Sequence, residues 1–293
     1  MNIQKSFQNN NGILYLVPTP IGNLEDMTFR AVRTLKEVDL IAAEDTRNTR
    51  KLLNHFEIHT PMVSYHEHNK ESSGRQLLEQ LKEKRNIALV TDAGMPAISD
   101  PGYELVRDAV KEGISVVSLP GANAALTSLT ASGINPQPFY FCGFLPRKKK
   151  EREKDLNELK KIRATLIFYE APHRLKETLT ALHDSFGNRE AVLARELTKK
   201  FEEYIRGSLE ELLDWAKNSE IRGEFCIIIE GTDENFDDED NQFWHTLNVN
   251  QHVEYYIEQG IIPKEAIKKA AKDRGMGKRD VYKIYHTDND EKN

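Results

Sequence analysis

The chain has 293 residues, of which 39% are apolar and 30% are charged, and its formal net charge is −6. This length and composition indicate a globular protein of about two domains, and the acidic balance argues against binding of nucleic acid through overall charge. The two cysteines, Cys142 and Cys226, suggest neither a disulfide framework nor a cysteine zinc site. Because no apolar run reaches the ~20 residues of a membrane helix and the first residues lack a signal-peptide core, we expect a cytoplasmic protein.

Short β-like runs alternate with amphipathic stretches along most of the chain. Leucines recur at helical spacing at 77, 78 and 81, and again at 175, 179 and 182. This alternation predicts an α/β protein with mainly parallel sheets, and the continuous apolar runs LIFYE and FCIIIE predict strands buried on both faces. The expected strands are 13–17, 40–43, 62–65, 87–90, 115–119, 140–143, 166–169, 191–194, 201–206 and 225–229.

The stretch 144–161 interrupts this pattern with the basic run RKKKEREK. We expect a domain boundary near it, with one lobe before and one after. The run fits either the solvated start of a helix or a basic edge that faces phosphate groups. The boundaries that we expect are a flexible tail at 1–11, an N-terminal α/β lobe at 12–119 and a second α/β lobe at 120–232.

Beyond these lobes the sequence becomes first acidic and then basic. The segment DENFDDED falls within an expected acidic linker, 233–242, and a helical domain is expected at 243–286. Residues 263–286 carry eight Lys and Arg against three acids. Pro263 suits the start of a helix, and Ile267, Ala270 and Ala271 would form its apolar face. Val281, Ile284 and Tyr285 would form the face of a second helix after a glycine turn. This is helix-turn-helix-like and favours nucleic acid, although a plain helical hairpin is the alternative.

Glycines, prolines and acids gather after several of the expected strands, at 18–26, 43–49, 91–102, 120–126 and 169–174. In open α/β sheets, ligands bind outside the carboxyl ends of the strands. No P-loop, dinucleotide fingerprint or nucleophile elbow is present in these loops. The His66-x-His68 pair lacks a third ligand, so we expect no metal.

Seven segments together resemble one known family: PTPIGNLEDMTFRA, AEDTRNTRKLL, SYHEHN, TDAGMPAISDPGYELV, PGANAALTSLTASG, FYEAPHRL and ARELTKKFEE. They are similar, in order, to the RsmI family of 16S rRNA (cytidine-2'-O)-methyltransferases, within the tetrapyrrole methylase superfamily. The resemblance implies a two-lobed tetrapyrrole-methylase-like fold, S-adenosylmethionine bound in the cleft between the lobes, and a homodimer. The implied substrate is the ribose of cytidine 1402 in 16S rRNA of the 30S subunit, with no DNA or membrane partner.

The resemblance also implies which residues bind the cofactor. Tetrapyrrole methylases have Gly-Asp-Pro where this chain has Gly94-Met95-Pro96, so Asp92 or Asp100 could supply the missing acid. The alternative for these two acids is turn formation or capping of the helix that follows. The expected cofactor-binding residues are Gly22, Asp92, Gly94, Met95, Ile98, Asn123, Ala124 and Tyr169.

A ribose hydroxyl is a weak nucleophile, so a carboxylate base or a nearby lysine would assist methyl transfer. Asp45 could instead form a surface ion pair that opens a helix. The catalytic candidates are Asp45, Asp100, Glu170 and Lys199. The expected RNA-binding residues are Arg47, Arg147, Lys148, Lys149, Lys268, Lys269, Lys272, Lys278 and Arg279.

Two rival functions fit parts of the sequence. A small-molecule methylase of the tetrapyrrole type would share the ligand-binding loops but would not need the basic C-terminal segment. A non-catalytic nucleic-acid-binding regulator would need that segment but not the loops.

Overall fold

The computed structural model describes residues 3–6, 8, 11–232, 244 and 247–290. The chain divides into two compact units, Met1–Asp233 and Glu234–Asn293. The predicted acidic linker at 233–242 lies outside the described residues. Part of the predicted flexible tail makes a specific contact, because the Gln4 side chain exchanges hydrogen bonds of 2.9 and 3.0 Å with the main chain of Val116.

The first sheet of the large unit is wholly parallel, with strand order β3-β2-β4-β1-β5. All of these strands fall within the predicted segments, and two of them match the predicted bounds. The strands are β1 Ile13–Leu16, β2 Leu40–Ala43, β3 Met62–Ser64, β4 Ile87–Val90 and β5 Ser115–Ser118.

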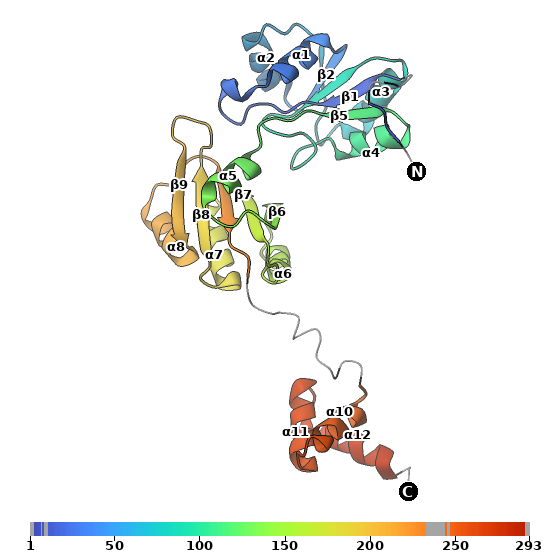
Figure 1. Cartoon of the computed structure of the whole chain (residues 1–293), viewed down its shortest axis with the longest axis vertical. Coiled ribbons are helices and arrows are strands. Elements are labelled where there is room, and N and C mark those ends of the chain that lie inside the picture. Colours follow the sequence, from blue (N-terminus) through green and yellow to red (C-terminus); the bar gives the residue numbers. More distant parts are fainter. Residues whose placement is uncertain (1–2, 7, 9–10, 233–243, 245–246, 291–293) are drawn as a thin grey trace. The chain divides into compact units, whose positions relative to one another are not determined.

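Helices cover both faces of this sheet (Figure 1). Because strand side chains alternate between faces, Ala88 and Val90 of β4 pack with α1 and α2, whereas Ile87 and Leu89 pack with α3 and α4. The helices are α1 Phe29–Glu37, α2 Thr46–His55, α3 Lys70–Lys82 and α4 Tyr103–Lys111, and a short 3-10 turn, η1 Leu24–Asp26, precedes α1.

The second sheet is mixed, with order β6-β7-β10-β8-β9. Only the β6–β7 pair is parallel among its described pairs, so the expectation of mainly parallel pairing is wrong for this sheet. The apolar runs of β7 and β10 indicate that these strands are buried on both faces. Strands in parallel pairs and strands in antiparallel pairs can both be buried in this way. The strands are β6 Phe139–Phe144, β7 Thr165–Glu170, β8 Glu190–Arg195, β9 Glu203–Ser208 and β10 Phe225–Ile229.

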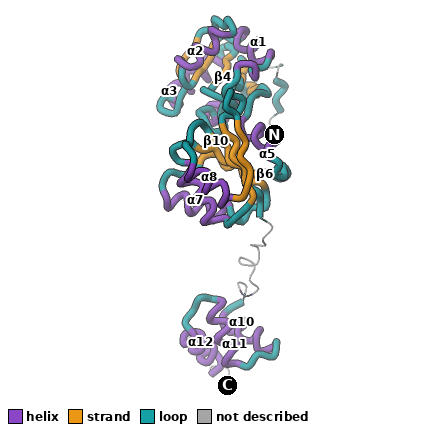
Figure 2. Tube along the Cα trace, turned by 90° about the vertical axis from the view of Figure 1, so that its left-hand side faces the viewer, coloured by secondary structure: helices purple, strands orange, loops and turns teal. Residues whose placement is uncertain are grey.

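This sheet is also covered on both faces (Figure 2). Helix α5 Ala124–Ser132 packs on one face, and α6 Lys149–Leu159, α7 Leu175–Phe186 and α8 Leu209–Asn218 pack on the other. The basic run at 147–154 falls on α6, between the paired strands β6 and β7. It therefore does not mark the change from one sheet to the other.

The small unit is helical over its described residues, with α10 Val249–Glu258, α11 Pro263–Asp273 and α12 Lys278–Asp290. The apolar face predicted for α11 is buried against α10 and α12, as are Val281 and Tyr285 of α12. Ile284 was expected on the same face, but it is 36% exposed. In the part of the chain that the structure describes, no helix is long and apolar enough to cross a membrane.

Candidate active site

The two central strands of the first sheet send their following helices to opposite faces. Strand β1 leads into α1 on one face, and its neighbour β4 leads into α4 on the other. The loops that follow such a pair diverge and leave a crevice at the carboxyl edge of the sheet, which is where ligands bind in open α/β folds. The fold therefore places the loops 17–24 and 91–102 at a binding position.

These two loops are joined at their base by an isolated bridge. The main chains of Thr19 and Gly94 exchange hydrogen bonds of 3.0 and 2.9 Å, and Thr19 Oγ1 donates to the carbonyl of Thr91 at 3.0 Å. Gly94 has φ of +74°, and a Cβ there would lie 3.4 Å from Ile21 Cγ2. Glycine suits this position because L side chains rarely adopt that backbone conformation and little space remains.

A cavity of about 290 Å³ opens beside these loops, and we call it the main cavity. Its size is near the lower end of the ~300–1,000 Å³ range of small-molecule sites. It is built from the loop ends of both sheets. The predicted site residues that it brings together are Gly94, Met95, Ile98, Asp100, Asn123, Ala124, Tyr169, Glu170 and Lys199.

Asp100 is the acid of the loop after β4 that lines the main cavity. Burial, followed by the nearby acids Glu44 and Asp92, raises its pKa from 3.8 to about 6. The alternative that Asp100 caps the next helix is wrong, because α4 has Gly102 at its N-cap and no side-chain cap bond. Among the described residues, no side chain is hydrogen-bonded to this carboxylate, so it can accept a proton from a ligand.

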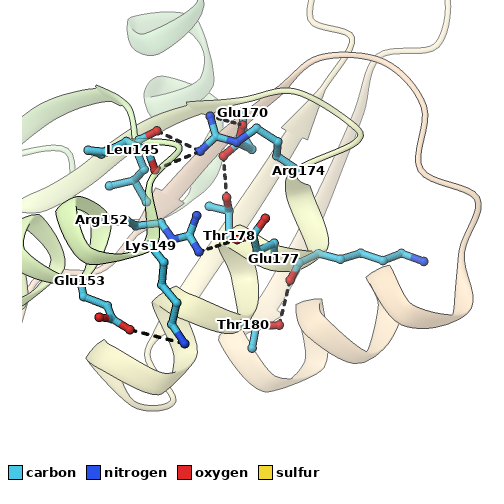
Figure 3. Close-up of polar contacts among 11 residues, drawn as sticks. Leu145, Lys149, Arg152, Glu153, Glu170, Arg174, Glu177, Thr178 and Thr180 are labelled. Atoms are coloured by element: carbon cyan, nitrogen blue, oxygen red, sulfur yellow. Dashed lines mark hydrogen bonds and ion pairs between the residues drawn. The ribbon is translucent and has the colours of Figure 1, made fainter.

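Glu170 also lines the main cavity, but its carboxylate is already occupied (Figure 3). One oxygen accepts the Ala171 N–H at 2.8 Å and lies 3.6 Å from Arg174 Nη1, and the other accepts the hydroxyl of Thr178. Arg174 in turn donates to the carbonyl of Leu145 at 2.9 Å. These contacts favour a structural role, in which Glu170 and Arg174 fix the loop after β7 against the end of β6.

Tyr169 links the second sheet to the start of α5. Its phenol oxygen accepts the Ala125 N–H at 3.1 Å, and burial raises the pKa of Tyr169 to about 12, so the phenol is neutral. Asn123 caps the same helix by accepting the Leu126 N–H at 2.9 Å. The predicted pair Asn123 and Ala124 therefore lies at a helix N-terminus whose geometry is fixed from both sides.

Lys199 crosses from the second sheet toward the loop after β1. A Cβ at Gly22 would lie 2.4 Å from Lys199 Cγ, so the lysine stem needs glycine there. Its ammonium lies 2.9 Å from Glu196 and 3.0 Å from Glu224. Burial alone would lower the pKa of Lys199, but the two carboxylates outweigh burial and raise it. Lys199 is thus a charged residue of the cavity wall whose position is fixed by two ion pairs.

Asp45 lies outside the lining of the main cavity. It is the N-cap of α2, accepts the Arg47 N–H at 2.8 Å and forms an ion pair with that guanidinium at 2.9 Å. Hydrogen bonds from Arg47 lower the pKa of Asp45 to about 2. The alternative of an ion pair that opens a helix describes this arrangement, and it favours a structural role for Asp45.

Gly22 and Asp92 line a different cavity, of about 270 Å³, which we call the side cavity. It is formed by the loop after β1, one side of α2 and the end of β4. The Asn48 amide donates to Asp92 at 3.3 Å, and the Asp92 N–H donates to Glu44 at 3.4 Å. These two residues were expected to bind the cofactor, and in the structure they line the side cavity and not the main cavity.

Several residues of the main cavity were not predicted. The loop that follows β8 contributes Glu196 and Leu197, although its sequence belongs to the motif ARELTKKFEE. Leu197 is a single apolar residue within RELTKK, and the sequence alone does not distinguish such a residue from one that packs in the core. The other unpredicted lining residues include Ile21, Phe144, Ala194, Glu224, Phe225 and Cys226.

Comparison with known proteins agrees with this geometry. Residues 13–213 match the family model of tetrapyrrole (corrin/porphyrin) methylases, which is more than half of the chain. The chain belongs to this family. The rRNA small subunit methyltransferase I of Bacillus subtilis is 63% identical to this methylase over 275 residues, 94% of each chain. The protein of the same name from Streptococcus pyogenes serotype M3 is 46% identical over 98% of this chain and 99% of that one.

Solved structures share the fold of this methylase at lower identity. Uroporphyrin III C-methyl transferase from Thermus thermophilus has a TM-score of 0.54 and 23% identity, over 75% of this chain and 97% of its own. A diphthine synthase has a TM-score of 0.59 and 15% identity, over 77% of this chain and 92% of its own. Both matches concern the fold alone.

The basic residues of the methylase have different surroundings. On α6, Lys148 and Lys149 pair with acids of their own helix, at 3.0 Å from Glu151 and 3.8 Å from Glu153 (Figure 3 shows the second pair). On the same helix Arg152 is buried and pairs with Glu177. A solvated helix start therefore describes this stretch well.

The lysines of the small unit are exposed as well. Lys268 lies 3.5 Å from Glu265, and Lys269 lies over the ring of Tyr256 at 4.7 Å. The predicted RNA-binding residues of this unit are all exposed: Lys268, Lys269, Lys272, Lys278 and Arg279. In the large unit, Arg47 and Arg147 are exposed as well.

Proposed function

We propose that this methylase transfers a methyl group from S-adenosylmethionine to the ribose 2'-hydroxyl of cytidine 1402 in 16S rRNA. The observation that carries the proposal is the near full-length match to proteins named rRNA small subunit methyltransferase I. The main cavity supports it, because a mainly apolar site at the switch point of the first sheet contains one carboxylate without a protein partner among the described residues.

The residues of the main cavity fit the cofactor. Main-chain groups around Gly94 and Met95 form one wall, the N-terminus of α5 forms another, and Ile98 and Phe144 add apolar surface. Backbone N–H groups suit the carboxylate and hydroxyls of such a ligand, and apolar side chains suit its adenine and methionine stem. When bound, S-adenosylmethionine supplies an electrophilic methyl group on a sulfonium.

Asp100 is the residue that we assign to proton transfer. Its carboxylate would accept the proton of the 2'-hydroxyl as that oxygen bonds to the methyl carbon, while the carbon–sulfur bond breaks and S-adenosylhomocysteine leaves. A pKa of about 6 leaves Asp100 mostly ionised at neutral pH and still close enough to that pH to act as a base. The fixed walls contributed by Glu170, Tyr169 and Lys199 would hold the reacting groups in line, which is the larger part of the task.

The small unit would supply most of the RNA affinity. Its exposed lysines lie on α11 and at the start of α12, while its apolar side chains are buried. Such contacts with phosphate groups strengthen binding without reading sequence and weaken as salt rises. A methylase for a small molecule would have no use for this unit, so we do not favour that function.

The experiment that tests the proposal follows tritiated methyl transfer to 30S particles and to naked 16S rRNA, with the labelled nucleotide mapped. Label on the 2'-oxygen of cytidine 1402 would support the proposal and show which form of the substrate is used. No transfer to either substrate, with cofactor binding intact, would favour a small-molecule substrate. We also expect a homodimer, which sedimentation of the full chain would test.

A further inference from the structure

The side cavity is a second binding site that adjoins the main cavity. Its lining comes from the loop after β1, from α2 and from the end of β4, all parts of the first sheet's half of the large unit. It holds about 270 Å³ and combines polar groups, among them Asn48, Thr49, Thr91 and Asp92. None of the contacts that shape the main cavity requires a second cavity at this place.

Two hydroxyls in its wall are buried without partners. Thr49 is 4% exposed and Thr91 is 1% exposed, and within residues 11–232 neither Oγ1 has a hydrogen-bond partner. A buried hydroxyl without a partner is costly, and the great majority of such groups in folded proteins are satisfied. Both threonines line the side cavity, and a turn of their side chains would bring these hydroxyls to the polar groups of a ligand held there.

The charges around the side cavity select against an anionic occupant. The carboxylate of Asp92 lies in the wall, and Glu44 receives the Asp92 N–H. A phosphate in the side cavity would meet the Asp92 carboxylate, with Glu44 close behind it outside the lining, and Lys51 is the one cation among the described residues of the lining that would offset them. A neutral heterocycle with an amino group fits better, because Asp92 can accept from the amino group while Asn48 and the threonines serve ring acceptors.

The position of the side cavity relative to the main cavity suits a nucleotide. Ile21 lines the main cavity and Gly22 the side cavity, and the same division separates Ala93 from Asp92. Adjacent residues are ~3.8 Å apart, so the two cavities share a thin wall made of both loops. A nucleotide with its sugar at the main cavity could therefore reach the side cavity with its base.

We propose that the side cavity takes the base of the target nucleotide, turned out of its stack, and that Asp92 and Asn48 read the amino-pyrimidine edge of cytosine. This rests on the proposed function and adds the origin of its base selectivity. Enzymes that modify single nucleotides commonly hold the extruded base in a pocket with contacts to its pairing edge. Asp92 accepts from the N4 amino group, a pairing that carboxylates make with cytosine.

The test compares methyl transfer to 30S particles that carry cytidine or uridine at the target position. Wild type should prefer cytidine by about tenfold or more in kcat/KM. Asp92→Asn should reduce that preference to about threefold or less, because an amide can also donate to the O4 of uracil. Its dissociation constant for S-adenosylmethionine should stay within about twofold of wild type.

Matched variants on one helix provide the control. Thr49→Val removes a hydroxyl of the side cavity at nearly constant volume and should raise KM for the 30S particle by about fivefold. Asn54→Ala alters an exposed residue of the same helix outside the cavity lining and should leave KM unchanged.

Three outcomes would overturn the proposal. Equal labelling of both particles by wild type would remove base reading and leave the proposed function standing. An unchanged preference in Asp92→Asn, with weaker cofactor binding, would assign Asp92 to the cofactor instead. No labelling of either particle by wild type would remove the proposed function, and the base site with it.

Discussion

The loops of the first sheet and those of the second sheet line the same cavity, but they use their polar groups differently. In the second sheet the side chains of Tyr169, Glu170 and Lys199 are all engaged with other protein groups. In the first sheet Asp100 lines the main cavity, and Thr49 and Thr91 line the side cavity, and their side chains have no such partners among the described residues. An acid in a strand-end loop can thus belong to either group, and only its contacts distinguish them.

The largest effect should come from Asp100, and Glu170, a second carboxylate of the main cavity, provides the comparison. Asp100→Asn should lower kcat by about 10²–10⁴-fold, because it removes the proton acceptor while keeping the shape of the side chain. The measurement is single-turnover methyl transfer to 30S particles. If Glu170→Gln lost more activity per folded molecule than Asp100→Asn, the proposed difference between the polar groups of the two sheets would be wrong.

A smaller effect should appear in stability when the second sheet's network is cut. Glu170→Ala leaves the buried hydroxyl of Thr178 and the Ala171 N–H without their acceptor, and it should cost about 2 kcal/mol in the free energy of unfolding. Chemical denaturation followed by circular dichroism would measure this loss.

Asp45→Asn, which keeps an N-cap acceptor, should retain turnover within about threefold of wild type.

The exposed lysines of the small unit should contribute a smaller effect again. Replacing Lys268 and Lys272 together by Ala should weaken binding to 30S particles by about tenfold at low salt, and the difference should shrink as salt rises. Filter binding over a salt series would measure it. Replacing Lys148 and Lys149 in the same way should give a weaker effect, because both lie near acids of α6, whereas of Lys268 and Lys272 only Lys268 has an acid partner among the described residues.

The smallest effect concerns the stability of the large unit as a function of pH. The folded state raises the pKa of Asp100 from 3.8 to about 6. The free energy of unfolding therefore falls as the pH rises through that range and Asp100 loses its proton. Asp100→Asn should therefore stabilise the protein by about 1 kcal/mol at pH 7.5, after partial exposure is considered, and by nearly nothing at pH 4. Thermal unfolding at the two pH values would show the difference, and equal shifts would contradict it.

Much of the fold was predictable because its strands are short, apolar and buried. Strands β2, β4 and β10 have the predicted bounds, whereas β9 begins two residues later than expected. Strand direction was not predictable for the second sheet, since a run such as FCIII is equally apolar in parallel and antiparallel pairs.

The site was predictable only in part, for a related physical reason. Loop position fixed where Gly94, Asp100 and Asn123 lie, because the carboxyl ends of strands meet at one edge. The engagement of Glu170 depends on Thr178 in the next helix, and a threonine in a helix gives no such signal. Thr49 and Thr91 were missed because a threonine that lines a cavity has the same sequence pattern as one that packs in a core.

The pair of main-chain hydrogen bonds between Thr19 and Gly94 also has a thermodynamic consequence. Each loop contributes to both cavities, so a ligand that orders the loops in one cavity lowers the entropic cost of binding in the other. Occupancy of the two cavities should then be linked with positive cooperativity. By reciprocity, bound S-adenosylmethionine raises the affinity for RNA by the same factor by which bound RNA raises the affinity for S-adenosylmethionine.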